Sequence, residues 1–390
     1  MSTYKYLIIG GGMAGDAAIR GIRQNDETGS ICLVSQEEHP PYNRPPLSKS
    51  LWFGKSEKTI WRPLDNLNVD VQLNRRIVQL DIAKKRAIDD RGSTYSFEKL
   101  LLATGGKVNR FPFGGDDIIY FRTLEDYRRL RDLTESKNRF AIIGGGFIGA
   151  EIAAGLANHQ KEVMMVFPEA GIGANVFPKE VSDHLTELFR ENGVAVHTGQ
   201  WLNALEKRQD KLVLKTREGL AIEAEGTVAG IGIKPNIEIA RQAGLTVNRG
   251  IVVNKHLQTS HPDVYAAGDV AEFYNSALGN HVIVEHEENA NMTGYFAGAA
   301  MTGHHQEYDY LPYFYSSLFA VKYEGVGEMN ASLQTVIDWK EPFQEGVIYY
   351  LKGKRVRGVV CWNIRKKLNA ARKLIAEPGP FEATDLMGKI

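Results

Sequence analysis

Gly10-Gly11-Gly12-Met13-Ala14-Gly15 and Gly144-Gly145-Gly146-Phe147-Ile148-Gly149 are two copies of one glycine fingerprint, and each follows a short apolar run. These runs, residues 6–9 and 140–143, predict buried parallel strands. Glycines at this spacing let a chain turn sharply from a strand into a helix and bring backbone amides against a pyrophosphate. One such motif also fits a plain tight turn, but two in matching contexts predict two bound dinucleotides.

The residues after each fingerprint predict a complete βαβ unit. Residues 16–23 and 151–158 have helical spacing, and residues 30–35 and 163–167 are apolar runs typical of strands. Each half of the chain therefore repeats the plan of a dinucleotide-binding domain.

An acidic side chain at the end of the second strand of such a unit binds the ribose hydroxyls of the nucleotide. Glu169 has this place in the second unit, where its charge would repel a 2′-phosphate, so the sequence favours NADH over NADPH. In the first unit Gln36 is the first polar side chain after Ser35 and Glu37 follows, so either residue could bind the ribose.

Three later segments combine a strand-like pattern with glycines, and the third returns the chain to its first domain. Glycines there would let the backbone approach a bound nucleotide. The residues concerned are Thr104 and Gly105, Gly232, and Gly268 followed by Asp269.

Composition excludes several classes of protein. The 390 residues contain 47 lysines and arginines and 47 acidic residues, so no net charge attracts nucleic acid or an anionic membrane. Cys32 and Cys361 lack C-x-x-C spacing, which disfavours disulfide exchange and predicts two buried thiols in a reducing compartment. No apolar run has the roughly 20 residues that span a bilayer, and the first strand begins near the first residue. We therefore expect a cytoplasmic protein without a membrane partner.

A basic run near the C-terminus is the one local exception to this balance. Residues 365–367 are followed by Arg372 and Lys373, and we expect them along one helix. Such a run is either a solvated helix face or a surface that docks an acidic protein.

Further motifs resemble those of FAD-dependent, NAD(P)H-using reductases: A-T-G at residues 103–105, A-G-D at 267–269 and P-Y-N-R-P-P-L-S-K at 41–49. Residues 49–53 and 358–364 make the chain most similar to the apoptosis-inducing-factor-like oxidoreductases, with ferredoxin and rubredoxin reductases as near relatives. The resemblance covers essentially the whole chain.

The resemblance implies an α/β fold with two Rossmann-like dinucleotide-binding domains, one for FAD and one for NAD, and a C-terminal α+β interface domain. Residues 1–114 and 234–311 would form a discontinuous FAD-binding domain. Residues 115–233 would form the NAD-binding domain and residues 312–390 the third domain, with an antiparallel sheet.

The resemblance also implies roles for the catalytic residues. Lys49 would lie beside the reactive edge of the flavin, with Glu151 as its counter-ion. Glu285 and His286 would open a helix aimed at the flavin pyrimidine. A cation there stabilises the negative charge that develops as a hydride reaches flavin N5.

Other residues would hold the cofactors. The resemblance puts Arg44 and Arg122 on the FAD phosphates and Asp269 on the ribityl chain, and Phe147 would gate the flavin face. Tyr315 stands where this family commonly has a tryptophan, which departs from its pattern. The remaining residues assigned to cofactor binding are Val78, Ile148 and Glu324, together with Gly10, Gly12, Ala14, Gly15, Gly144, Gly146 and Gly149 of the fingerprints.

The expected activity is transfer of a hydride from NADH to FAD, followed by transfer of electrons to an unidentified acceptor, with no metal implied. A small electron-acceptor protein and a quinone both remain open as partners. The alternatives are an NADH-dependent ferredoxin or rubredoxin reductase, and an NADH-sensing redox-switch binding protein. A monomer and an NADH-dependent homodimer are both compatible with the sequence.

Overall fold

A computed structural model describes residues 2–390 and divides the chain into two compact units. The first unit takes the chain up to Asn43, then Glu57–Lys107 and Lys234–Phe314. The second unit takes Arg44–Ser56, Val108–Ile233 and Tyr315–Ile390. Each unit is therefore assembled from three separate stretches of sequence.

A sheet with the strand order β3-β2-β1-β6-β5-β4 forms the core of the first unit, and β18 pairs with β6. Its strands are β1 (Ser2–Ile9), β2 (Ile31–Val34), β3 (Val69–Gln72), β4 (Ile77–Asp81), β5 (Arg86–Asp89), β6 (Thr94–Leu102) and β18 (Val264–Ala266). β1 runs parallel to β2 and β6, with Ile8 opposite Leu33 and Leu101. This confirms the buried parallel strand predicted before the first fingerprint.

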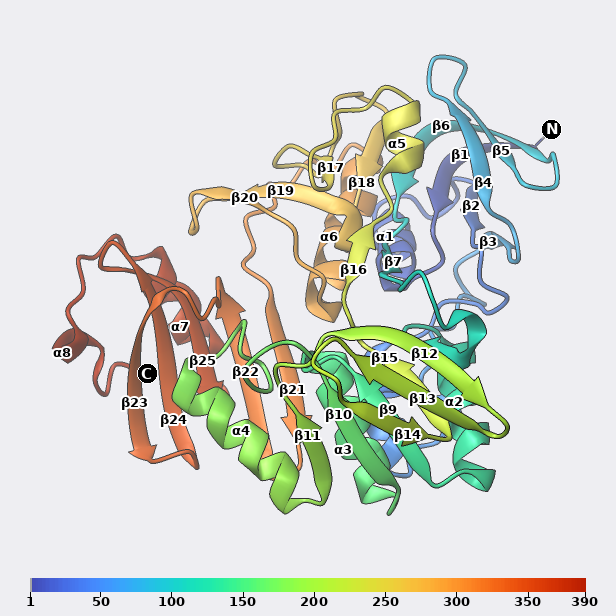
Figure 1. The fold of residues 1–390 in the computed structure, drawn as a ribbon. Coiled ribbons are helices and arrows are strands. Elements are labelled where there is room, and N and C mark those ends of the chain that lie inside the picture. The colour runs from blue at the N-terminus through green and yellow to red at the C-terminus, as the bar shows by residue number, and fades with distance from the viewer. Residues whose placement is uncertain (1) are drawn as a thin grey trace. The chain divides into compact units, whose positions relative to one another are not determined.

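Two helices of the first unit pack with almost no side chain between them. They are α1 (Met13–Arg23) and α6 (Glu287–Met301), drawn side by side in Figure 1. A Cβ added at Gly298 would lie 2.1 Å from the carbonyl oxygen of Ala18, and one at Gly294 would lie 2.3 Å from that of Ala14. Glycine is therefore required at positions 294 and 298, where the backbone of α6 lies against that of α1.

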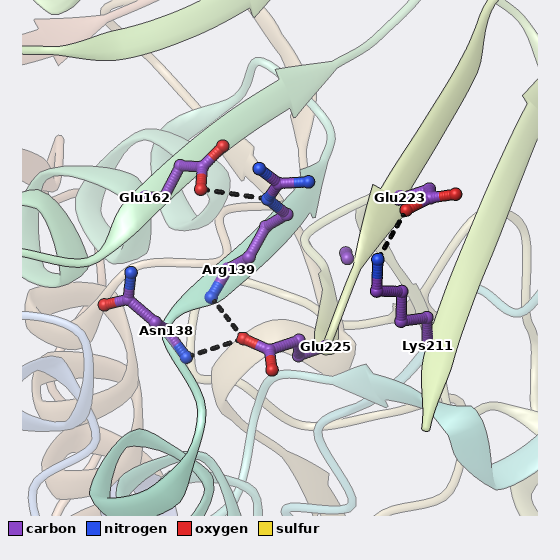
Figure 2. Close-up of a pocket in the computed structure, with 7 residues that line it drawn as sticks. Asn138, Arg139, Glu162, Lys211, Glu223 and Glu225 are labelled. Carbon is purple, nitrogen blue, oxygen red and sulfur yellow. Dashed lines mark hydrogen bonds and ion pairs between the residues drawn. The ribbon is translucent and has the colours of Figure 1, made fainter. Parts of the chain in front are cut away.

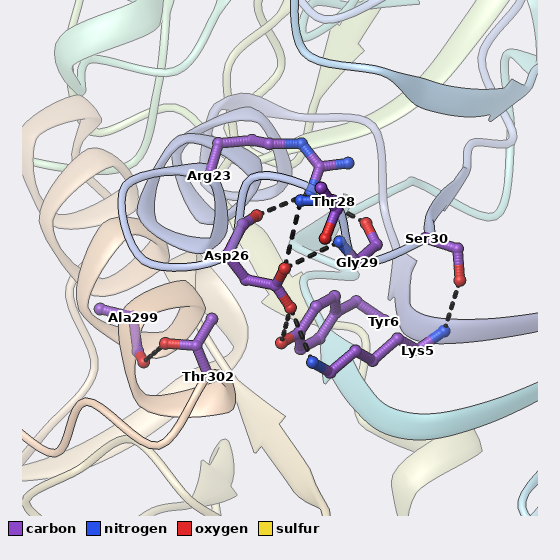
Figure 3. A network of polar contacts seen from close by, with 9 residues as sticks. All are labelled: Lys5, Tyr6, Arg23, Asp26, Thr28, Gly29, Ser30, Ala299 and Thr302. Carbon is purple, nitrogen blue, oxygen red and sulfur yellow. Dashed lines mark hydrogen bonds and ion pairs between the residues drawn. The ribbon is translucent and has the colours of Figure 1, made fainter.

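A polar network ties the start of β1 to the loop after α1 (Figure 3). The Asp26 carboxylate accepts hydrogen bonds from Lys5 Nζ, from the Tyr6 hydroxyl and from the Gly29 amide, each at 2.8 Å. The hydrogen bond from Lys5 is the largest of the effects that lower the pKa of Asp26. The network fixes the first βαβ unit at the end remote from its fingerprint.

Smaller elements complete the first unit. A three-stranded sheet has the order β17-β19-β20, and β7 pairs with β16 where the chain passes between the units. These elements are β7 (Gly106–Val108), β16 (Ile233–Pro235), α5 (Glu238–Gln242), β17 (Ile251–Val252), β19 (Ala271–Asn275) and β20 (Asn280–Val282).

The second unit contains a parallel five-stranded sheet with the order β11-β10-β9-β15-β8. Its strands are β8 (Ile118–Tyr120), β9 (Arg139–Ile143), β10 (Glu162–Val166), β11 (Val194–His197) and β15 (Gly226–Ala229). Its helices are α2 (Leu124–Ser136), α3 (Phe147–Asn158) and α4 (Lys179–Glu191), and a small antiparallel sheet adds β12 (Leu202–Arg208), β13 (Lys211–Thr216) and β14 (Ala221–Ala224). The second predicted βαβ unit is confirmed as β9-α3-β10.

The C-terminal segment forms another five-stranded sheet, with the order β21-β22-β25-β24-β23. Its elements are β21 (Tyr313–Leu318), β22 (Val321–Gly327), β23 (Gln334–Glu341), β24 (Glu345–Lys352), β25 (Arg355–Trp362), α7 (Leu368–Ala376) and α8 (Ala383–Leu386). β22 and β24 run antiparallel to β25, as predicted. The predicted fold class is confirmed.

Two sequence predictions concern smaller features. The prediction that residues 365–367 share a helix with Arg372 and Lys373 is wrong: they precede α7, and Lys366 adopts a left-handed backbone conformation with φ of 64°. The two cysteines are free and buried, as predicted. No helix within residues 2–390 is long and apolar enough to cross a membrane.

Candidate functional site

Three glycines of the first fingerprint have different roles in the turn from strand to helix. Gly10 has a φ of 121°, and a Cβ there would lie 2.0 Å from the carbonyl oxygen of Ala103. A Cβ at Gly15 would lie 2.2 Å from the carbonyl oxygen of Gly10, whereas no described atom lies within 4 Å of a Cβ at Gly12. Gly12 caps α1, so an open approach leads to the unpaired amides of a helix N-terminus, which fits a pyrophosphate.

The second fingerprint repeats this geometry. Gly144 has a φ of 112°, and its Cβ would lie 2.5 Å from the carbonyl oxygen of Gly230. A Cβ at Gly149 would lie 2.1 Å from the carbonyl oxygen of Gly144, while a Cβ at Gly146 would meet no described atom within 4 Å. Gly146 caps α3, so each unit offers one turn whose geometry fits a pyrophosphate.

The polar residues predicted to bind ribose lie at the ends of the expected strands. Glu169 follows β10, is half-buried and accepts a hydrogen bond of 3.3 Å from Asn175 Nδ2. In the first unit Gln36 is exposed after β2, whereas Glu37 is half-buried and accepts a hydrogen bond of 2.6 Å from the Tyr42 hydroxyl. The choice between Gln36 and Glu37 stays a prediction.

Lys49 and Glu151 form an ion pair inside the second unit. Lys49 Nζ lies 2.7 Å from Glu151 Oε1, and only 2% of the glutamate side chain is exposed. The hydroxyl of Ser316 donates to the same oxygen at 2.6 Å, and the hydroxyl of Ser48 donates to Oε2 at 2.6 Å. Three donors therefore compensate the desolvation of this carboxylate.

Trp52 anchors the segment that carries Lys49 to helix α3. Its indole Nε1 donates to the carbonyl oxygen of Leu47 at 2.8 Å, and its own carbonyl oxygen lies 2.8 Å from His159 Nε2. A Cβ on Gly155 of α3 would lie 3.0 Å from the Trp52 ring, so glycine permits this close contact. The backbone around Lys49 is held on both sides.

Aromatic rings surround the ion pair. The ammonium of Lys49 lies 5.3 Å from the centre of the Tyr315 ring, within the range of a cation–π contact. The Phe147 ring lies 6.4 Å from that of Tyr323, which stacks on Trp362 at 5.7 Å. Tyr315 thus contacts the pair, Phe147 begins the helix that carries Glu151, and Ile148 beside it is partly exposed.

In the first unit, several predicted residues adjoin the first fingerprint. Gly268 has a φ of 75°, its amide donates to Thr293 Oγ1 at 2.9 Å, and its Cβ would lie 3.0 Å from that of Ala14. Asp269 follows it directly. The structure therefore brings this Gly-Asp pair to the helix that the first fingerprint opens.

Thr104 and Gly105 are joined to Asn236. Thr104 Oγ1 donates to the carbonyl oxygen of Asn236 at 2.9 Å, and Asn236 Nδ2 donates to that of Thr104 at 2.8 Å. The Asn236 amide donates to the Gly105 carbonyl oxygen at 2.8 Å. Gly232 lies just before this contact, with a φ of 83°.

His286 caps the N-terminus of α6, as predicted for the start of a helix. Its ring stacks on Phe314 with centres 5.0 Å apart, while Glu285 before it is exposed. The imidazole is therefore held at the positive end of the helix dipole.

Arg44 and Arg122, both predicted to bind the FAD phosphates, lie next to each other in the second unit. Arg44 Nη1 donates to the carbonyl oxygen of Arg122 at 3.1 Å, and the Arg122 amide donates to Asp126 at 3.0 Å. Two other candidates lie elsewhere: Val78 is 42% exposed on the edge strand β4, and Glu324 lies on β22 opposite Cys361.

A surface hollow of about 240 Å³ lies at the other end of the second parallel sheet (Figure 2). Arg139 Nε pairs with Glu162 at 2.9 Å and Lys211 pairs with Glu223 at 2.9 Å, while Glu225 accepts from the Arg139 amide. Both of its cations are paired with carboxylates, and Arg139 and Glu162 stand at the amino ends of β9 and β10. The hollow is therefore separate from the second fingerprint, which follows the carboxyl end of β9.

Sequence reasoning missed four residues around the ion pair: Ser48, Trp52, Ser316 and Tyr323. Ser48 and Trp52 stand inside motifs that drew attention to Lys49 alone. Ser316 follows Tyr315 in a segment without helical or strand periodicity strong enough to single it out. Ser48 and Ser316 lie 103 and 165 positions from Glu151 in the sequence, so spacing gives no signal for these two contacts.

Comparison with known proteins identifies the family. The model of the pyridine nucleotide-disulphide oxidoreductase family matches residues 4–294, and that of the apoptosis-inducing factor, mitochondrion-associated, C-terminal domain matches residues 337–377.

Three relatives cover nearly all of the chain. It is 33% identical to the mitochondrial apoptosis-inducing factor 1 of Dictyostelium discoideum, covering 98% of this chain and 80% of the relative. It is 32% identical to monodehydroascorbate reductase 3 of Arabidopsis thaliana, covering 99% and 96%. A solved covalent complex of putidaredoxin reductase with putidaredoxin matches with a TM-score of 0.91 and 28% identity, covering 98% and 95%. The chain therefore belongs to the pyridine nucleotide-disulphide oxidoreductase family, and it is an FAD-dependent NAD(P)H oxidoreductase.

Proposed function

We propose that this chain accepts a hydride from NADH and delivers the electrons to a small acidic electron-carrier protein. The observation behind the first half is the Lys49–Glu151 ion pair, whose buried glutamate lies on the helix opened by the second fingerprint. When bound, FAD accepts the hydride and releases its electrons to a second substrate.

The residues of this chain provide position and charge. Phe147 and the open turn at Gly146 receive the dinucleotide, and Glu169 binds its ribose. Lys49 stabilises negative charge on the reduced flavin ring, and Glu151 holds Lys49 in position. His286 adds the favourable effect of its own charge or of the α6 helix dipole. We propose these roles together with those of the other predicted site residues. We also propose the predicted domain boundaries at residues 114, 234 and 311.

The first experiment tests the hydride step. The FAD-loaded protein is mixed anaerobically with NADH or NADPH while flavin absorbance is followed. We expect rapid bleaching with NADH and slow bleaching with NADPH. Lys49→Met is expected to slow the bleaching, and a wild-type protein that NADH does not bleach would contradict the proposed function.

Glu169 is expected to set the nucleotide preference. Glu169→Ala combined with Ala170→Arg removes the charge that repels a 2′-phosphate and supplies one that attracts it. The ratio of kcat/KM for NADPH to that for NADH should rise by about tenfold or more, equivalent to about 1.4 kcal/mol. Glu162→Ala, at the opposite end of β10, is the matched control.

A basic surface supports the second half of the proposal. Its five exposed members form no ion pair with any described residue: Lys322, Arg365, Lys366, Lys367 and Lys373. Hydrogen bonds of 2.7 Å between Lys322 and Asn363 join two of its segments. Exposed lysines and arginines without ion-pair partners, on a chain of zero net charge, are expected to steer an acidic partner at low ionic strength.

Reduction of an acidic [2Fe–2S] ferredoxin by NADH tests this surface. The rate should fall steeply with salt and should drop in the double variant Lys366→Glu, Lys367→Glu, while flavin reduction by NADH stays unchanged. Lys340→Glu removes an exposed lysine that is paired with Glu345 and is the matched control. An equal loss in both variants would contradict docking at the basic surface.

Other features stay predictions. A quinone acceptor is the second candidate, and it would give NADH oxidation without salt dependence. An NADH-sensing role would give a long-lived reduced complex and a change of mass on NADH binding. The cytoplasmic location and the choice between a monomer and an NADH-dependent homodimer also stay predictions.

A further inference from the structure

We infer that Ser316 is a positioning residue for hydride transfer, because its hydroxyl fixes the carboxylate that in turn fixes Lys49. The inference rests on the proposed function and adds a residue from the C-terminal segment to the site.

The geometry around Glu151 gives Ser316 a specific task. Glu151 Oε1 accepts from both Lys49 Nζ, at 2.7 Å, and Ser316 Oγ, at 2.6 Å. Because both donors bond to this one oxygen, the Ser316 hydroxyl limits the positions that Oε1 can take relative to the Lys49 ammonium. Ser48 holds the second oxygen at 2.6 Å. The carboxylate cannot rotate about its own axis without losing one of these bonds.

Ser316 is itself held in place. It is 3% exposed on β21, next to strand β22, which carries the fully buried Tyr323. Burial raises the pKa of Tyr323, so its hydroxyl stays neutral at physiological pH. Tyr323 stacks on Trp362, which extends the support into β25.

The adjacent residue, Tyr315, contacts the other member of the pair. Its ring centre lies 5.3 Å from Lys49 Nζ. Two consecutive residues of β21 therefore contact the ion pair. The Tyr315 ring contacts the Lys49 ammonium, and the Ser316 hydroxyl bonds to the Glu151 carboxylate. A shift of β21 along its axis would change both contacts together.

Removing the Ser316 hydroxyl should loosen the ion pair without emptying the nucleotide site. Glu151 would keep Lys49 and Ser48 but lose the donor that orients Oε1. We expect the limiting rate of flavin reduction by NADH to fall about tenfold, the size expected for one hydrogen bond to a charged group. The dissociation constant for NAD⁺ should change by less than about twofold, since the hydroxyl of Ser316 bonds to Glu151 and not to the turn at residues 144–149.

The experiment compares four variants of the FAD-loaded full chain. Ser316→Ala removes the hydroxyl, Ser316→Cys keeps the volume with a weak donor, and Ser316→Thr restores a hydroxyl. Ser317→Ala, at the exposed next position of β21, is the matched control. Stopped-flow bleaching by NADH, calorimetric titration with NAD⁺ and the midpoint potential of the flavin are measured for each, with melting temperature as the check on folding.

The Ala and Cys variants should show the slow limiting rate and a more negative midpoint potential, because a less well-placed ammonium stabilises reduced flavin less. The Thr variant should recover at least part of both, and Ser317→Ala should match the wild type. A wild-type rate and potential in Ser316→Cys would overturn the inference, and so would an equal loss in Ser317→Ala. Failure of NADH to bleach the wild type would instead overturn the proposed function itself.

Discussion

Trp52→Ala tests whether the Lys49 segment depends on its contact with helix α3. Trp52 is 2% exposed, and truncating a tryptophan so deeply buried costs about 3–5 kcal/mol. The variant also removes the Nε1 donor of the 2.8 Å bond to Leu47, which adds about 1 kcal/mol. We therefore expect a loss of about 4–6 kcal/mol in the free energy of unfolding of the second unit.

Differential scanning calorimetry of the FAD-loaded protein measures this loss. For a unit of this size, each kcal/mol lowers the melting temperature by about 2–4 °C, so the transition of the second unit should fall by about 10 °C or more. Trp52→Phe keeps most of the packing and loses only the donor, so its loss should be about 1–3 kcal/mol.

The chain offers a matched control for this prediction. Trp201 is 53% exposed and meets Arg217 in a cation–π contact at 5.6 Å, so Trp201→Ala should cost about 0.5–1 kcal/mol. The reasoning is refuted if Trp52→Ala destabilises the protein no more than Trp201→Ala does. It is also refuted if Trp52→Phe proves as damaging as Trp52→Ala.

Two further predictions concern the first unit. Asp26→Asn should lower its stability by about 2 kcal/mol at neutral pH because the carboxylate accepts several hydrogen bonds. Folding lowers the pKa of Asp26, so the contribution of its carboxylate to stability is complete above about pH 4 and is lost as the pH falls further. The urea midpoints of the variant and the wild type should therefore converge in acid. A difference that stays constant with pH would contradict this prediction. Gly298→Ala would place a Cβ 2.1 Å from the Ala18 carbonyl oxygen and force α6 away from α1. The free energy of unfolding should fall by at least about 1–3 kcal/mol. An unchanged melting temperature would disprove this prediction.

The parallel sheets could be predicted from the sequence because their signals are local. Each fingerprint, the strand before it and the helix after it lie within about 25 residues, and the structure forms both units in the expected order. The basic run shows the limit of local reasoning. Charge alone does not distinguish the bend at residues 365–367 from the helix that begins at Leu368.

The surroundings of the ion pair could be predicted only in part. The resemblance pairs Lys49 with Glu151, and the structure places Nζ of the lysine 2.7 Å from Oε1 of the glutamate. The hydroxyls of Ser48 and Ser316 could not be found in the same way, because a serine that bonds a distant carboxylate looks like any serine in the sequence. The contact is set by tertiary packing.

The second unit has a consequence for synthesis of the chain. Residues 44–56 leave the ribosome early, but the helix on which Trp52 rests begins at Phe147, and Ser316 follows much later. Domains generally fold as units during translation, starting from the N-terminus. Glu151 therefore gains its last hydroxyl partner only when about four-fifths of the protein has been made, so a chain truncated before that point lacks both this partner and the C-terminal sheet that carries it.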